Sequence, residues 1–245
     1  MQKERGAVPE IAIILAGGAG SRLGDLTDTM PKPMVDVNGK PILEHIIREI
    51  AANGITKIRI AVGYRADMIM DYFKDGRGFG AEISYSVEKR PAGTGGALAA
   101  AMRDSGIREG EGECAFVSNG DELFRLDISG MLKEHRRAGV PVTIALKRIG
   151  NVEGFGVVKM NGSMVTSFVE KPDPEEVDGG LISIGKYIID QEAVEMMPKQ
   201  ESFSLERDFF REAAAQGKIS GYMTDTEWYP TDNMERYERA CREWH

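Results

Sequence analysis

A glycine-rich loop with two cations follows the first apolar run of this 245-residue sequence, "IAIIL" at residues 11–15. The loop contains Gly17, Gly18, Gly20, Arg22 and Lys32. Glycines allow successive backbone N–H groups to turn toward one anion, and an arginine fork matches two phosphate oxygens. The loop therefore predicts a phosphate site, although a tight turn between a strand and a loop would also use glycines.

Two lysines precede prolines, one in each half of the sequence: Lys32 before Pro33 and Lys171 before Pro172. A residue before proline is biased toward extended geometry, which fixes the direction in which its side chain leaves the backbone. Either lysine alone is ordinarily a solvated cation. Two lysines held in this way would suit a polyanion that lies between the two halves.

The segment "FVSNGDELF" (116–124) places a carboxylate, Asp121, directly after an apolar run. Ligands of open parallel sheets bind beyond the carboxyl ends of the strands. A magnesium ion that carries substrate phosphates needs one or two carboxylates at such a place. Asp121 is therefore a candidate metal ligand, and a simple Asn-Gly-Asp turn is the structural alternative.

A second cluster of glycines, Gly93, Gly95 and Gly96, lies in "VEKRPAGTGGAL" (87–98) at the start of an alanine-rich helical pattern. Several glycines in a helix are costly unless something packs against the bare backbone. A flat nucleobase is one candidate. Close packing of this helix on its neighbours explains the glycines equally well, so both interpretations stay open.

Apolar, β-rich runs alternate with helical patterns up to about residue 140, which predicts an α/β fold with a mostly parallel sheet covered by helices. Later segments such as "VTIALKRI" (142–149) are strand-like, and Asn161-Gly162 predicts a hairpin turn. No repeat or linker divides the chain. We therefore expect a single domain, 1–245, with a first half at 10–125 and a second half at 126–245.

The composition excludes several classes of protein. The net charge is -8, which disfavours a general nucleic-acid binder because its field repels phosphates. No apolar run approaches the length of a membrane span, and the first residues lack the apolar centre of a signal peptide, so we expect a soluble cytoplasmic protein without a membrane partner. Cys114 and Cys241 lack the spacing of a zinc site and predict ordinary thiols.

Taken in order, these motifs resemble the sugar-phosphate nucleotidyltransferase family over almost the whole chain. "LAGGAGSRLGDLTDTMPKPM" (15–34) resembles the family's signature loop, "GTGGAL" its base-binding turn, "NGD" its metal aspartate and "FVEKP" its sugar-side Glu-Lys pair. The resemblance implies a glycosyltransferase-A-like nucleotidyltransferase fold, in which a Rossmann-like mixed sheet carries an inserted, β-rich, sugar-binding half.

The resemblance also implies a reaction in which a sugar 1-phosphate attacks the α-phosphorus of a nucleoside triphosphate and pyrophosphate leaves. Such displacements depend mainly on positioning and charge neutralisation. Arg22 would hold the triphosphate, Lys32 would draw charge from the α-phosphate, Lys171 would bind the sugar phosphate, and Asp121 would hold Mg²⁺. The nucleotide-binding residues implied by the family are Leu15, Ala16, Gly17, Gly18, Gly20, Glu88, Gly93 and Thr94.

Glu88 occupies the position where the family meets the pairing edge of the base, five residues before Gly93. A carboxylate only accepts hydrogen bonds, and guanine presents two adjacent donors, whereas uracil presents one N–H between two acceptors. The residue therefore predicts GTP. A solvated glutamate at the end of a strand is the structural alternative.

For the sugar, "GFGVV" (154–158) resembles the family's sugar loop, in which the Gly156 backbone and Glu170 would bind ring hydroxyls. Together with guanine, the resemblance points to mannose 1-phosphate or a manno-heptose 1-phosphate. The family's closing metal carboxylate is displaced here, because Pro230 occupies its position. We assign Asp232 as the second ligand and Asp225 as a weaker substitute. An N-cap role for Asp232, in a capping box with Glu235, is the alternative.

Three other functions compete with this interpretation. A cytidylyl- or uridylyltransferase of the same family would differ only in the base. A non-catalytic regulatory homologue would have lost charges from the reaction centre, yet Arg22, Lys32, Asp121 and Lys171 are all present. A nicotinamide-dependent dehydrogenase is disfavoured, because Leu23 replaces the third glycine of the dinucleotide fingerprint. The motifs do not determine the oligomeric state, and a homo-oligomer is compatible with them.

Overall fold

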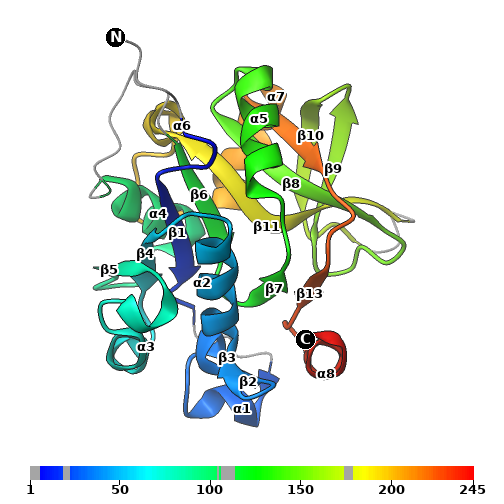
Figure 1. Cartoon of the computed structure of the whole chain (residues 1–245). Coiled ribbons are helices and arrows are strands. Elements are labelled where there is room, and N and C mark those ends of the chain that lie inside the picture. The colour runs from blue at the N-terminus through cyan, green and yellow to red at the C-terminus, as the bar shows by residue number, and fades with distance from the viewer. Residues whose placement is uncertain (1–5, 19–22, 104, 106–113, 174–178) are drawn as a thin grey trace.

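The computed structural model describes residues 6–18, 23–103, 105, 114–173 and 179–245 (Figure 1). The elements of the first half are β1 Ile11–Ala16, α1 Asp25–Asp28, the 3-10 turn η2 Lys32–Met34, β2 Asp36–Val37, β3 Lys40–Pro41, α2 Ile42–Ala52, β4 Lys57–Val62, α3 Ala66–Phe73, the 3-10 turn η3 Arg77–Phe79, β5 Glu82–Val87, α4 Gly93–Arg103, β6 Cys114–Asn119 and β7 Glu122–Phe124.

The elements of the second half are α5 Ile128–Ala138, β8 Val142–Ile149, β9 Gly156–Asn161, β10 Met164–Glu170, β11 Gly180–Asp190, α6 Gln191–Met196, the π-helical turn η5 Leu205–Phe210, α7 Arg211–Ala215, β12 Ile219–Met223, β13 Trp228–Pro230 and α8 Met234–Glu243. None of the helices in the described ranges has both the length and the apolar character that a membrane span requires.

Nine strands of the described chain form one mixed sheet in the order β5-β4-β1-β6-β11-β8-β12-β10-β9. The first four strands in this order are parallel to one another, whereas β11 is antiparallel to both β6 and β8. The prediction of a mixed α/β sheet flanked by helices is confirmed. The parallel strands β5, β4, β1 and β6 all belong to the first half, where helices connect them, and in the second half β12 is parallel to β8.

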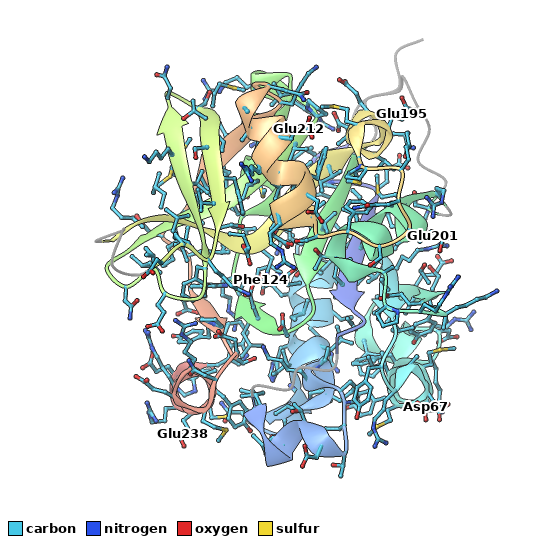
Figure 2. The ribbon with its side chains drawn as sticks, turned by 180° about the vertical axis from the view of Figure 1, so that it is seen from behind. Asp67, Phe124, Glu195, Glu201, Glu212 and Glu238 are labelled. Carbon is cyan, nitrogen blue, oxygen red and sulfur yellow. The ribbon has the colours of Figure 1, made fainter. Side chains whose placement is uncertain are left out.

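Alternating side chains of β1 belong to two separate cores, one on each face of the sheet. Ala12 and Ile14 pack with α2 and α5, whereas Ile11 and Ile13 pack with α4 and the later helices. Figure 2 views the second of these faces, with Glu195 of α6 and Glu212 of α7 in front of the sheet. This burial on both faces explains why the first strand is apolar throughout.

The parallel strands end together at one edge of the sheet. In the register, Ala16 of β1 lies beside Val62 of β4, and Leu15 lies beside Asn119 of β6. The glycine loop after β1, Glu88 after β5 and Asp121 after β6 therefore begin at the same edge. At the other side of the sheet, β9 and β10 form the predicted hairpin. Its two-residue turn is Gly162-Ser163, one residue later than the predicted Asn161-Gly162, because Asn161 is the last residue of β9 and pairs with Met164.

Candidate active site

Two adjoining pockets open at the carboxyl ends of the parallel strands. The first, which we call the glycine pocket, has a volume of about 360 Å³. Its lining includes Leu15, Ala16, Gly17, Gly18, Lys32, Glu88, Gly93, Thr94, Asn119 and Asp121. All of the predicted nucleotide-binding residues that lie in the described part of the chain are therefore brought together. Gly20 and Arg22 lie outside the described residues.

The second pocket, which we call the carboxylate pocket, has a volume of about 820 Å³ and is lined by residues of both halves. Its lining includes Asp121, Glu122, Gly156, Glu170, Lys171, Ser183, Gly185, Glu206, Arg207 and Asp232. The predicted sugar-side residues thus share one pocket. Gly93, Thr94, Asn119 and Asp121 line both pockets, so Asp121 stands where the two pockets meet.

Lys32 and Asp121 are in direct contact at this boundary. Nζ of Lys32 lies 2.7 Å from Oδ2 of Asp121, and the lysine side chain is only 7% exposed. The buried residue Lys32 opens the 3-10 turn η2 instead of an extended segment, so the expected effect of Pro33 on the lysine backbone is wrong. Burial of Lys32 beside a carboxylate nevertheless fixes the cation at the meeting point of the pockets.

Lys171 also departs from the extended geometry expected before a proline. Its φ angle is +49°, in the left-handed region, and its N–H donates to the carbonyl oxygen of Phe155. This hydrogen bond ties the end of β10 to the start of β9. The Lys171 ammonium lies 3.4 Å from Oε1 of Glu170. Burial raises the pKa of the Glu170 carboxyl, and the negative charge of Glu206 raises it further.

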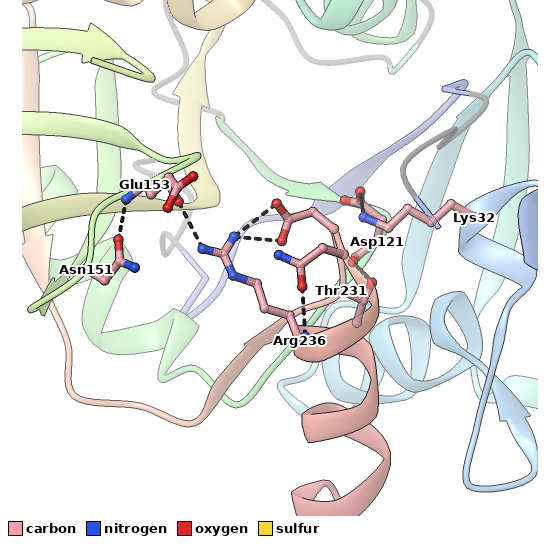
Figure 3. A network of polar contacts seen from close by, with 8 residues as sticks. Lys32, Asp121, Asn151, Glu153, Thr231 and Arg236 are labelled. Atoms are coloured by element: carbon pink, nitrogen blue, oxygen red, sulfur yellow. Dashed lines mark hydrogen bonds and ion pairs between the residues drawn. The ribbon is translucent and has the colours of Figure 1, made fainter. Parts of the chain in front are cut away.

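Asp232, in the loop before α8, lines the carboxylate pocket together with Asp121. Figure 3 shows Thr231 of the same loop beside Asp121. The Thr231 hydroxyl donates to the backbone oxygen of Asp121 at 2.7 Å, and Nη1 of Arg236 lies 2.8 and 3.0 Å from the two carboxylate oxygens of Asp232. The same arginine donates to the Glu153 carbonyl. Asp232 is thus oriented by an ion pair at the edge of the carboxylate pocket.

Asn233, and not Asp232, caps the last helix. The Asn233 side chain accepts the backbone N–H of Arg236 at 2.9 Å. The alternative that gave Asp232 the N-cap role is therefore wrong, because the helix begins one residue later than a cap at Asp232 requires. Asp225, the weaker substitute ligand, is exposed and does not line either pocket.

Glu88 lies against the glycine loop. Its Oε2 accepts the backbone N–H of Ala92 at 3.0 Å, which closes the turn before α4. A side chain on Gly17 would overlap Oε1 of Glu88, so glycine is needed there for close approach. The carboxylate is consequently held by the protein at the wall of the glycine pocket and is not a freely solvated group.

The glycines of α4 have a structural explanation. A Cβ atom on Gly95 would overlap the ring of Phe203, and one on Gly96 would overlap the backbone oxygen of Glu201. The Gly95 N–H also donates to the Phe203 carbonyl at 3.0 Å. Of the two interpretations left open, close packing therefore accounts for Gly95 and Gly96. Gly93, with a φ angle of +68°, lines both pockets.

This packing predicts the effect of adding one methyl group. We expect Gly95→Ala to lower the free energy of unfolding by about 1–3 kcal/mol, the usual cost of overpacking a well-packed site. Gly78→Ala is the matched control, because nothing lies within 4 Å of a Cβ there. Thermal unfolding measures both variants. Equal melting temperatures for the two would contradict the packing explanation.

Two further charged residues of the carboxylate pocket region escape prediction from the sequence motifs. Glu122 follows Asp121, and its Oε2 lies 3.3 Å from Nζ of the fully buried Lys186. Burial raises the pKa of Glu122 and lowers the pKa of Lys186, while the charge of each partner opposes the shift of the other. The available signal was a lysine inside the apolar run "LISIGKYIID" (181–190).

A comparison with family models matches residues 11–244 to the nucleotidyl transferase family. D-glycero-alpha-D-manno-heptose 1-phosphate guanylyltransferase of Aneurinibacillus thermoaerophilus is 34% identical over 95% of this chain and 97% of that protein. Mannose-1-phosphate guanylyltransferase of Mycobacterium tuberculosis is 33% identical over 94% of this chain and 63% of that protein.

Solved structures agree with this assignment. Crystal structures of HddC from Yersinia pseudotuberculosis are 28% identical to this chain and cover 96% of it and all of their own chain. Their TM-scores are 0.80 and, for the structure complexed with GMP-PN, 0.78. The similarity therefore extends across both halves of the mixed sheet.

Proposed function

Because this chain belongs to the nucleotidyl transferase family, we propose that it joins GTP to mannose 1-phosphate or a manno-heptose 1-phosphate and releases pyrophosphate. One observation carries the proposal: Asp121, in contact with Lys32, lines both the glycine pocket and the carboxylate pocket. Two anionic reactants placed in these pockets would meet beside the buried lysine. Charge neutralisation at that point lowers the barrier that their mutual repulsion creates.

The glycine pocket takes the nucleotide in this proposal. Backbone N–H groups near Gly17 and Gly18 suit phosphates, and Glu88 suits the two adjacent donors of guanine. The carboxylate has four lone-pair positions, so accepting the Ala92 N–H leaves capacity for a base. The names of the guanylyltransferase relatives and the GMP-PN complex of HddC support the same base.

The carboxylate pocket takes the sugar 1-phosphate. Lys171 is the cation that would bind its phosphate, while Glu170 and the Gly156 backbone would accept and donate hydrogen bonds to ring hydroxyls. Phe168 packs under Gly156, where any side chain would overlap the phenylalanine ring or approach Glu170. In this proposal, the nucleotide-binding half, 10–125, and the sugar-binding half, 126–245, would meet at Asp121, which lines both pockets.

The acidic residues at the boundary fit a Mg²⁺ ion. Asp121 and Asp232 both line the carboxylate pocket, and their hard carboxylate oxygens are the ligands that Mg²⁺ prefers. When bound, the ion neutralises phosphate charge and helps to orient the reacting groups. Lys32 and Arg236 hold the two carboxylates in place, so the chain supplies oriented ligands for the ion.

Removal of divalent ions tests this part of the proposal. We expect EDTA to abolish turnover, because the phosphate charge is then incompletely neutralised, and added Mg²⁺ to restore it. Pyrophosphate release measures the effect. Full activity after exhaustive dialysis against EDTA would contradict the metal requirement.

A substrate matrix tests the proposed function as a whole. The purified protein is mixed with each of the four nucleoside triphosphates and with 1-phosphates of mannose, manno-heptose, glucose and galactose, in the presence of Mg²⁺. We expect the highest kcat/KM for GTP with a manno-configured sugar. Faster turnover of UTP, dTTP or CTP would overturn the choice of base, and binding of GTP without any turnover would indicate a regulatory homologue.

A further inference from the structure

Lys186 is a fully buried cation in the middle of β11. Its side chain is 0% exposed, and Nζ lies 3.3 Å from both Oε2 of Glu122 and the carbonyl oxygen of Ile184. The ammonium also lies 4.8 Å from the ring centroid of Phe124. Burial of a charged pair is costly and seldom improves stability over apolar residues of the same size. Stability alone therefore does not explain the pair.

The partner of Lys186 faces the site. Glu122 lines the carboxylate pocket, its side chain is 17% exposed, and Oε1 has no hydrogen-bond partner within the described ranges of the chain. A carboxylate with one oxygen held by a buried lysine has a fixed position. Its other oxygen can accept a hydrogen bond from a ligand in the pocket.

The backbone of β11 makes room for this carboxylate. Gly185 has a φ angle of +66°, and a Cβ atom there would lie 2.5 Å from Nδ2 of Asn119 and 2.6 Å from Oε2 of Glu122. The pairing of β11 with β8 is irregular between Ser183 and Tyr187, which is the segment that contains Gly185 and Lys186. Irregular strand pairing next to active sites redirects side chains. The strand is thus shaped around the Glu122 carboxylate.

The charge of Glu122 restricts what it can bind. A carboxylate repels phosphate groups, so the anionic ends of both reactants belong near Lys32 and Lys171. A hydroxyl group is the remaining part of a sugar 1-phosphate that donates a hydrogen bond, and hydrogen bonds to charged acceptors are strong. The geometry points to one role, which rests on the proposed function: Glu122, positioned by Lys186, is a specificity-determining residue that accepts a hydrogen bond from a sugar hydroxyl.

The double variant Glu122→Met/Lys186→Met, which removes the carboxylate acceptor, tests this role. It replaces the ion pair by neutral side chains of similar size, and so avoids leaving one buried charge unpaired. We expect KM for the sugar 1-phosphate to rise about 10- to 100-fold, the usual scale for a hydrogen bond to a charged group. KM for GTP and the Mg²⁺ concentration for half-maximal activity should stay within about twofold of the wild-type values. A twofold change is much smaller than the effect of losing one hydrogen bond to a charged group.

A second Glu–Lys pair serves as the matched control. Lys218 and Glu192 also lie 3.3 Å apart, but their side chains are largely exposed and neither residue lines one of the two pockets. Glu192→Met/Lys218→Met should leave both KM values unchanged. Glu122→Asp keeps the charge next to Lys186 but withdraws the carboxylate, and it should raise the sugar KM even if the double variant does not fold.

Deoxy sugars separate a hydroxyl contact from a structural role. The wild-type protein should prefer the parent sugar 1-phosphate over the analogue that lacks one particular hydroxyl by about 10- to 100-fold. Both Glu122 variants should lose the preference for the parent sugar over this one deoxy analogue, and their preferences at the other hydroxyls should not change. An unchanged preference, or a large rise in the Mg²⁺ requirement, would overturn the inference. If the wild-type protein forms no product with any sugar, the proposed function fails as well, so the two failures are distinguishable.

Discussion

Lys32→Met is expected to lower kcat by at least about 10²-fold, the usual scale for losing one charge-stabilising contact in a transition state. Lys32 is buried at the boundary of the two pockets, where charge on the α-phosphate increases as the sugar phosphate attacks. The methionine fills nearly the same volume but carries no charge. Initial rates at saturating GTP and sugar 1-phosphate measure the loss.

The same variant must be separated from a loss of folding. Lys32 contributes an ion pair to Asp121, so thermal unfolding accompanies the kinetics. Lys57→Met is the matched control, because Lys57 is exposed at the start of β4, at the opposite end of that strand from the pockets. A folded Lys32→Met protein with kcat near that of Lys57→Met would show that the lysine has no part in the reaction.

Glu88→Gln is expected to lower kcat/KM for GTP by about 10²-fold and to raise it for UTP. The glutamine amide oxygen can still accept the Ala92 N–H, so the turn before α4 is preserved. The amide nitrogen adds a donor that opposes the guanine donors, and a buried mismatch of this kind costs about 1–3 kcal/mol. Rates with all four triphosphates at equal sugar concentration measure the change.

Glu82→Gln controls for the loss of one negative charge. Glu82 is exposed at the start of β5, the strand that ends just before Glu88. The Glu82→Gln variant should leave the ranking of the four triphosphates by kcat/KM unchanged. An unchanged ranking in Glu88→Gln as well would assign Glu88 only to the hydrogen bond that closes the turn.

The sequence predicted those parts of the fold that local patterns control. The run "IAIIL" is buried on both faces as β1, and the expected alternation of strands and helices gives the parallel strands β1, β4, β5 and β6. Because such strands end at one edge, the position of the pockets was also predictable. The order of β8 to β12 was not predictable, because pairing between strands that are distant in the sequence leaves little local signal.

Several details of the site depend on contacts between distant residues. The Lys32–Asp121 ion pair joins residues 89 positions apart. Phe203, which packs against glycines of α4, belongs to the second half of the chain. Neither contact has a signature in a short motif. The left-handed Lys171 is held by a hydrogen bond to Phe155, and that tertiary contact overrides the local preference of a residue before proline.

Product identification by ³¹P NMR tests the central claim most directly. The protein, GTP, the 1-phosphate of mannose or a manno-heptose, and Mg²⁺ are mixed, and the phosphorus signals are followed with time. We expect the signals of a GDP-sugar and of pyrophosphate to appear in a one-to-one ratio, and neither to appear with Lys32→Met on the same timescale. Hydrolysis of GTP without transfer to the sugar, or products formed equally fast by Lys32→Met, would contradict the account.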